Sequence, residues 1–251
     1  MRFLPIKTRV LLPPKDNLFS VLDKFLPRLR EGDIVMITSK VLAIHQGRCV
    51  KITEKIKKDS LIKSEADAYL PRRHVPDEHV MLTIKDNTLI PTAGIDVSNG
   101  NGYYVLWPKN VNRLLKQIWQ YLRKKHRLKH LAVVSTDSHT VPLRFGVLGV
   151  STGFYGLEPV IDHRGKPDIF GRPLTITRVN AVDALAVMSV FLMGESDETT
   201  PILIIRGAKL VTFTDKPTYK KLIIPRRTDN YAPLLKIFRK SRKTKKRRKT
   251  D

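Results

Sequence analysis

Residues 133–156 limit the possible folds of this chain more than any other stretch. They begin with a short apolar run rich in β-branched residues, which is typical of a buried strand. The run ends at Asp137, and glycines follow at positions 146, 149, 153 and 156. Folds that mix helices and strands place ligands beyond the carboxyl ends of buried strands, so we predict that this stretch holds the functional site in a glycine-rich turn.

Predicted strands and helices alternate along the rest of the chain. The pattern predicts strands at 9–12, 34–38, 80–89, 103–107, 131–135 and 201–206, with an extended segment at 41–52. Helices are predicted at 17–29, 60–69 and 179–193, and a further one begins after Asn110. The helix at 179–193 is apolar almost all round, so we expect it to be buried. This mixture is typical of an α+β fold.

Composition indicates a globular cytoplasmic protein with anionic partners. The 251 residues, 41% of them hydrophobic, can bury a substantial core. Cys49 is the only cysteine, which excludes an intrachain disulfide and suits a reducing compartment. No apolar run approaches the roughly 20 residues that a membrane-spanning helix needs, so no membrane partner is expected. The formal charge of +24 favours anionic ligands.

The C-terminal end concentrates this positive charge. Residues 236–251 contain 10 Lys or Arg against one Asp. A segment of this composition cannot form a packed core, and we predict that residues 239–251 are a disordered basic tail. Its lysines and arginines are expected to attract nucleic acid without sequence preference.

Asp96 and Asp137 are the candidate metal ligands. Both are predicted to lie in loops after strands, and Mg²⁺ or Mn²⁺ prefers carboxylates combined with substrate phosphates. Ser138 can add a hydroxyl ligand. Structural roles in turns or helix caps stay an alternative for each aspartate. The chain has no P-loop motif, so a nucleotide would need another scaffold, and the charged loop at 161–172 is predicted to face a ligand.

An ordered set of short motifs resembles the coenzyme F420 gamma-glutamyl ligase family. The set comprises Ser39-Lys40, Gly47-Arg48, AGID-x-SN at 93–99, TDS at 136–138 with Arg144 and Gly146, DHRGKPDIFGRPLTIT at 162–177, and MGE…P…IRG at 193–207. The matches run in order over most of residues 10–207. None is as specific as a P-loop, but their order is hard to obtain by chance and strengthens the metal interpretation of Asp96 and Asp137.

The resemblance implies a ligase that attaches L-glutamate through an amide bond to an anionic small-molecule acceptor, coenzyme F420-0. It implies GTP as co-substrate, Mg²⁺ or Mn²⁺, and K⁺ as an additional candidate cation. The implied architecture is a homodimer with a two-part α+β fold. In that fold, residues 1–80 with 195–238 form a nucleotide-side lobe, and residues 81–194 form a second lobe that carries the metal-site loops.

The resemblance also implies roles for individual residues. The implied metal ligands are Asp96, Asp137 and Ser138; the nucleotide-binding residues are Leu11, Leu12, Pro13, Ser39, Lys40, Asn99, Gly194 and Glu195; the catalytic residues are Lys40, Asp137 and Arg144. The expected chemistry activates the acceptor carboxylate as an acyl phosphate. Metal and cationic side chains assist because they spread the charge of the transferred phosphoryl group.

Two segments depart from the family pattern. AIHQGR at 43–48 stands where SKAEGR is usual, and DSHTVPLR at 137–144 stands where the family has DTxGRxxR. The second change leaves the metal ligands in place but removes a glycine and an arginine, so the acceptor stays open. Three hypotheses follow: a coenzyme F420-0 ligase, a folate-type gamma-glutamyl ligase with the same mechanism, and a nucleic-acid-binding relative without catalysis.

Overall fold

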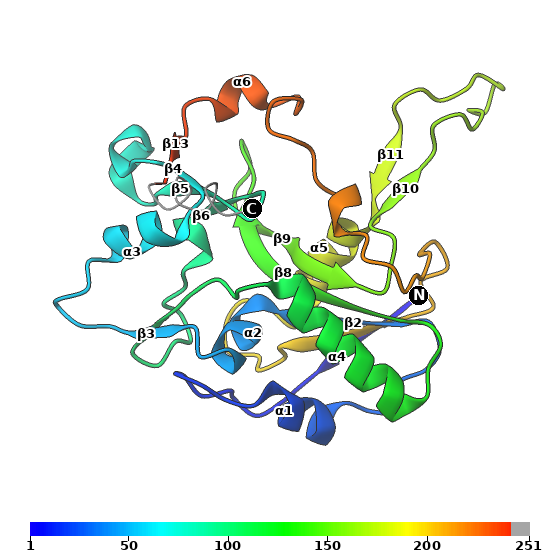
Figure 1. Ribbon diagram of the computed structural model, residues 1–251, viewed down its shortest axis with the longest axis horizontal. Helices are drawn as coiled ribbons and strands as arrows, with labels where there is room; N and C mark the ends of the chain where they lie inside the picture. Colours follow the sequence, from blue (N-terminus) through cyan, green and yellow to red (C-terminus); the bar gives the residue numbers. More distant parts are fainter. Residues whose placement is uncertain (242–251) are drawn as a thin grey trace, which may run out of the picture.

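The computed structural model describes residues 1–241 and contains a central five-stranded sheet with smaller sheets beside it (Figure 1). The strand order is β1–β12–β2–β8–β9, and only the β2–β8 pair is parallel. These strands are β1 (Arg2–Ile6), β2 (Asp33–Thr38), β8 (Leu131–Thr140), β9 (Val147–Tyr155) and β12 (Ile202–Arg206). The parallel pair brings the carboxyl ends of β2 and β8 to the same edge of the sheet.

Helices cover both faces of the central sheet. The helices are α1 (Leu18–Phe25), α2 (Ser39–His45), α3 (Lys58–Glu65), α4 (Val111–His126), α5 (Ala181–Met193) and α6 (Ala232–Leu235). Side chains alternate along each strand, so Val35 and Val133 pack against α1, α2 and α4, whereas Met36 and Val134 pack against α5 on the other face. This double burial explains why the central strands read as continuous apolar runs.

The remaining strands form three small sheets. One has four strands in the order β13–β4–β5–β6, and the others are the pairs β3–β7 and β10–β11. The bounds are β3 (Cys49–Lys51), β4 (Ala68–Leu70), β5 (Leu82–Lys85), β6 (Thr88–Pro91), β7 (Tyr103–Val105), β10 (Val160–Asp162), β11 (Arg178–Asn180) and β13 (Arg239–Lys240). Short 3₁₀ helices are η1 (Arg72–His74), η2 (Pro76–Glu78), η3 (Thr92–Gly94) and η4 (Tyr219–Lys221). The predicted α+β class is confirmed.

The predicted division into lobes is not visible as a division of the central sheet. That sheet takes β1, β2 and β12 from the ranges predicted as the first lobe, and β8 and β9 from the range predicted as the second. The division into two lobes therefore stays a prediction. The fold also reaches into the range predicted as the tail, because β13 pairs with β4 and Ser241 is buried. Residues 242–251, the rest of that tail, lie outside the described residues. No helix within residues 1–241 is long and apolar enough to cross a membrane.

Several local predictions were wrong. Residues 41–52 were predicted as extended, but Ser39–His45 form α2, whose residues 41–44 are all buried. A helix buried on every side has no apolar periodicity to distinguish it from a strand. The first strand is β1 rather than residues 9–12. The helix predicted as buried, α5, leaves Phe191 78% exposed, because only one of its faces packs on the sheet.

The glycines at 149 and 153 lie in a strand, β9, and not in the predicted turn. A Cβ added at Gly149 would fall 2.2 Å from the carbonyl oxygen of Ala186 in α5. The absent side chain therefore lets α5 approach the sheet closely.

We expect Gly149→Ala to lower the free energy of unfolding by about 3 kcal/mol, because the added carbon meets backbone that cannot move aside. Urea denaturation measures the change. Gly146→Ala is the control, since a Cβ there meets nothing within 4 Å and only its φ of +89° causes strain; its expected cost is about 1 kcal/mol. Equal costs for the two variants would contradict the close-packing explanation.

Candidate active site

A pocket of about 540 Å³ opens where the parallel pairing of β2 and β8 ends. Thr38 and Thr136, which are register partners in the parallel pair, both line it. The remaining walls come from the start of α2, the segment at residues 8–11, the loop at 96–101 and the loop at 194–201 that follows α5. The pocket lies at the predicted carboxyl end of β2, but the prediction that Asp137 lies in a loop after its strand is wrong. β8 continues to Thr140 because it pairs with β9, so Asp137 lies within that strand.

Asp137 is held at the floor of the pocket by its neighbours. Its Oδ2 accepts a hydrogen bond of 2.9 Å from Ser39 Oγ, and its Oδ1 accepts one of 2.9 Å from the Ser138 backbone N–H. Ser39 is the first residue of α2, directly after β2. Burial raises the pKa of Asp137 to about 6, and the hydrogen bond from Ser39 offsets this only in part. The carboxyl group thus lies in surroundings that disfavour its charge unless a cation is near.

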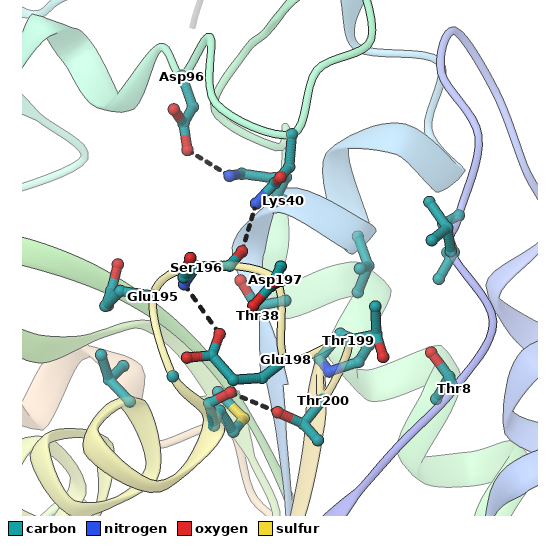
Figure 2. A pocket seen from close by; sticks show the side chains of 18 of the residues that line it. Thr8, Thr38, Lys40, Asp96, Glu195, Ser196, Asp197, Glu198, Thr199 and Thr200 are labelled. Carbon is teal, nitrogen blue, oxygen red and sulfur yellow. Dashed lines mark hydrogen bonds and ion pairs between the residues drawn. The ribbon is translucent and has the colours of Figure 1, made fainter.

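Lys40 and Asp96 form an ion pair across the pocket. Lys40 Nζ lies 2.5 Å from Asp96 Oδ2 and donates a 3.0 Å hydrogen bond to the Ser98 carbonyl oxygen. Burial alone would raise the pKa of Asp96, but the charge and hydrogen bond of Lys40, together with the hydrogen bonds from Ser98, outweigh it and the pKa is lowered. Figure 2 shows the two side chains pointing toward one another. The surroundings of Asp96 therefore favour its charged form, whereas those of Asp137 disfavour the charged form.

The loop at 194–201 closes another side of the pocket (Figure 2). Gly194 follows α5 with a φ of +81° and a ψ of 168°, a backbone conformation that essentially only glycine adopts, so glycine is required at this turn. Asn99 Nδ2 donates to the Ser196 carbonyl oxygen at 2.9 Å, and Ser138 Oγ donates to Glu195 Oε2 at 3.3 Å. Burial also raises the pKa of Glu195. These bonds hold the loop against Ser138 of β8 and against Asn99, which lies in the segment after η3.

The pocket is acidic although the protein is strongly basic. Its lining residues include two cations, Arg9 and Lys40, and the following five carboxylates: Asp96, Asp137, Glu195, Asp197 and Glu198. An anionic ligand would be repelled by this excess unless cations accompanied it. Oxygen donors of this kind suit a hard divalent cation, and Ser138 adds a hydroxyl. Within residues 1–241 no three His, Cys, Asp or Glu side chains form a preassembled metal-binding group.

Comparison with known proteins places the chain in a family. The family model described as F420-0:Gamma-glutamyl ligase matches residues 5–207. The chain belongs to this family. The resemblance found in the short motifs is therefore confirmed.

Several relatives of this chain are named coenzyme F420:L-glutamate ligase. The relative from Methanopyrus kandleri is 28% identical over 226 residues, covering 83% of this chain and 88% of that protein. The relative from Methanothermobacter thermautotrophicus is 29% identical over 215 residues, covering 80% and 85%. The relative from Methanocaldococcus jannaschii is 28% identical over 201 residues, covering 72% and 78%. The similarity thus spans most of each protein.

The structure brings together most of the site residues predicted for this gamma-glutamyl ligase. Leu11, Lys40, Asp96, Asn99, Asp137, Ser138, Gly194 and Glu195 all line the pocket. Ser39 contacts it through its hydrogen bond to Asp137. Leu12 and Pro13 do not line the pocket, and Leu12 is 57% exposed. The assigned roles stay predictions.

Two predicted ligand-facing regions lie elsewhere. Arg144 is exposed in the tip that joins β8 to β9 and does not line the pocket. The loop at 161–172 belongs to the β10–β11 hairpin, which projects from the body of the molecule (Figure 1). No residue of this loop lines the pocket either. Charges and glycines are typical of any exposed hairpin loop, so they did not show whether this loop faces the pocket.

Sequence reasoning missed several pocket residues. Thr8, Arg9, Thr136 and Asn101 line the pocket but were not proposed as site residues. Thr136 precedes Asp137 in the TDS motif and Asn101 follows Asn99 closely, so nearness in the chain was the available signal for these two. Thr8 and Arg9 precede α1 by several residues and reach the pocket only because the chain folds back there.

Proposed function

We propose that this protein is a GTP-dependent ligase that joins L-glutamate to a carboxylate of coenzyme F420-0 and requires Mg²⁺ or Mn²⁺. The observation that carries the proposal is the pairing of a carboxylate-rich pocket with Lys40 at the carboxyl ends of β2 and β8. The family match and the names of the relatives support the ligase reaction and its substrates. The acidic lining supports a nucleotide that enters together with divalent cations.

Asp96, Asp137 and Ser138 are the residues that would hold the cation. When bound, a divalent cation supplies positive charge that stabilises the transferred phosphoryl group and its leaving group. Ser39 orients Asp137 through its hydrogen bond of 2.9 Å. Asp137 gains most from a nearby cation, because its charged form is otherwise disfavoured by burial.

The proposed reaction has two steps. An oxygen of the acceptor carboxylate attacks the γ-phosphorus of GTP, forming an acyl phosphate and releasing GDP. The amine nitrogen of glutamate then attacks the acyl carbon, and inorganic phosphate leaves as the amide forms. Lys40 is placed to balance phosphate charge, and Glu195, whose pKa is raised by burial, can accept the proton that the amine loses.

Incubation of the purified protein with Mn²⁺, labelled glutamate and a nucleotide tests the proposal. Separate reactions contain F420-0 or a folate-type pterin as acceptor, and GTP or ATP as nucleotide. We expect glutamylated F420-0, with GDP and phosphate released in equal amounts. A glutamylated pterin would instead identify the folate-type alternative, and no product with either acceptor would contradict the ligase assignment. Light scattering of the same sample tests the homodimer that we also propose.

We expect Mn²⁺ binding to weaken as the pH falls below about 6, by about tenfold per pH unit, because protons compete with the metal for Asp137. Between about pH 7 and 8 the affinity should change little, since Asp137 and Asp96 are then both ionised without metal. Electron paramagnetic resonance of free Mn²⁺ measures the affinity. An affinity that does not change between pH 5 and 7 would exclude Asp137 from the ligand set.

A further inference from the structure

The C-terminal extension, defined here as residues 208–251, carries much of the positive charge of this protein. It lies beyond the family match, which ends at residue 207. It contains 16 Lys or Arg against three Asp and no Glu, and therefore contributes +13 of the formal charge of +24. Its cations are thus not explained by the ligase pocket, and none of residues 208–241 lines that pocket.

The described part of the extension follows a defined path across the molecule (Figure 1). Near its start, Phe213 forms a β-bridge with Leu157, and Thr218 Oγ1 donates a 2.6 Å hydrogen bond to the Leu157 carbonyl oxygen. Tyr219 then donates its hydroxyl to the Asp86 carbonyl oxygen at 3.1 Å. The extension is thereby attached to the central sheet and, through the β5–β6 turn, to the four-stranded sheet.

The far end of the described extension is attached as well. Arg239 and Lys240 form β13 on the edge of β4. Ser241 is buried and donates its hydroxyl to the Lys63 carbonyl oxygen in α3 at 2.8 Å. Both ends of the described extension are therefore held against the folded body of the protein.

The cations along this path face solvent and mostly lack acidic partners. All nine Lys and Arg side chains between residues 208 and 241 are exposed. Of these, only Lys221 forms an ion pair within residues 1–241, with Glu158. Lys57 and Lys63 of the neighbouring α3 region are exposed too. Uncompensated charges on one fixed strip attract an extended polyanion more strongly than the same charges scattered over a surface.

We propose that residues 208–241 and α3 form a nucleic-acid-binding face that contacts the phosphodiester backbone. Lys and Arg side chains bind phosphates without reading sequence. Phe213 and Tyr219 pack against the core, and Tyr231 is the one largely exposed aromatic ring in residues 208–241, so a platform for base stacking is not the expected contact. An anionic membrane fits less well, because the exposed apolar side chains are spread singly along the path and α6, which carries Leu234, spans only four residues.

Fluorescence anisotropy with a labelled oligouridylate RNA tests this face on the full-length protein. The first variant replaces Lys236, Arg239 and Lys240 by Gln. We expect it to bind RNA about 3- to 10-fold more weakly at low salt, and to lower the slope of log affinity against log salt by about 2. The matched control replaces Arg113, Lys124 and Lys129 by Gln, three exposed cations in or just after α4 that make no ion pair among the described residues. Its affinity should stay within about twofold of the unaltered protein.

A second variant ends at Ser241 and loses the seven cations that follow. We expect at least about tenfold weaker RNA binding with unchanged ligation, because the pocket is separate. Comparable binding of duplex DNA supports a backbone contact, and strong discrimination by base sequence contradicts it. The proposal is overturned if the unaltered protein does not bind RNA, or if both triple variants weaken binding equally. It is also overturned if the first triple variant has no effect, or if phosphatidylserine vesicles are bound more tightly than RNA.

Discussion

Asp137→Asn is expected to reduce ligation by about 10²–10³-fold and, at the same time, to stabilise the protein in the absence of metal and nucleotide. The loss of activity follows because an amide supplies no negative charge to a bound cation. The gain in stability follows because burial raises the pKa of Asp137 to about 6 in the folded protein, above its unfolded value of 3.8. The charged carboxylate therefore opposes folding.

The pH dependence of this gain has a defined sign. The protonated form of Asp137 supports folding fully below about pH 4, and that support is lost as the pH rises through about 6. Asparagine resembles the protonated form at every pH. The variant should thus match the unaltered protein near pH 4 and exceed it by about 3 kcal/mol above pH 7, or roughly 8 °C in Tm.

Asp96→Asn provides the opposing control. The pKa of Asp96 is lowered because Lys40 outweighs the effect of its burial, so its charge supports folding above the unfolded pKa and this support is lost in acid. Asp96→Asn should therefore inactivate the enzyme and also lower Tm at pH 7. Calorimetry with and without Mn²⁺, together with the ligation assay, measures both effects. A lower Tm for Asp137→Asn at pH 8 would contradict the account of Asp137.

Lys40→Gln is expected to reduce kcat/KM by about 10²–10³-fold, because it removes one of the two cations that line the pocket. The same change leaves Asp96 without the partner that lies 2.5 Å away, so the pKa of Asp96 should rise. Lys40→Arg is not expected to restore activity fully, since a planar guanidinium does not reproduce the compact ammonium group.

Arg9→Gln is the matched control for Lys40. Arg9 is the other cation of the pocket, but its guanidinium is bound to Asp16, 2.5 Å away, rather than to a candidate metal ligand. We expect its loss to reduce kcat/KM by about tenfold or less. Steady-state kinetics of both variants with GTP and F420-0 distinguish the two positions. Retention of more than about a tenth of kcat/KM by Lys40→Gln would show that Lys40 is not catalytic.

Local sequence was sufficient to locate the centre of the site. Asp96, Asp137 and Lys40 each belong to a short motif, and Lys40 and Asp137 lie next to apolar runs that are visible in the sequence. The parallel pairing of β2 and β8 ends at Thr38 and Thr136, so the residues that follow these two partners, Ser39 and Asp137, meet there. The roles implied by the family could therefore be assigned to residues that the structure brings together.

Other features had no local signal. Residues 41–44 are buried on all sides, so their apolar run did not distinguish a helix from a strand. The position of Arg144 depends on the length of the β8–β9 hairpin, which extends to Thr140 and Val147 and carries the arginine away from the pocket. Arg9 reaches the pocket through a turn held by Asp16 and not through any periodic element.

The sequence by itself determined the family, the α+β class, the carboxylates of the site and the basic character of the C-terminal extension, because motif order, apolar periodicity and charge are properties of the chain. Only the tertiary structure decided that the partners of Asp96 lower its pKa in spite of burial, whereas burial raises the pKa of Asp137. It also decided that an acidic pocket forms in a basic protein. Burial and pairing are set by residues far apart in the chain, such as Ser39 and Asp137, and these meet only when β2 and β8 align.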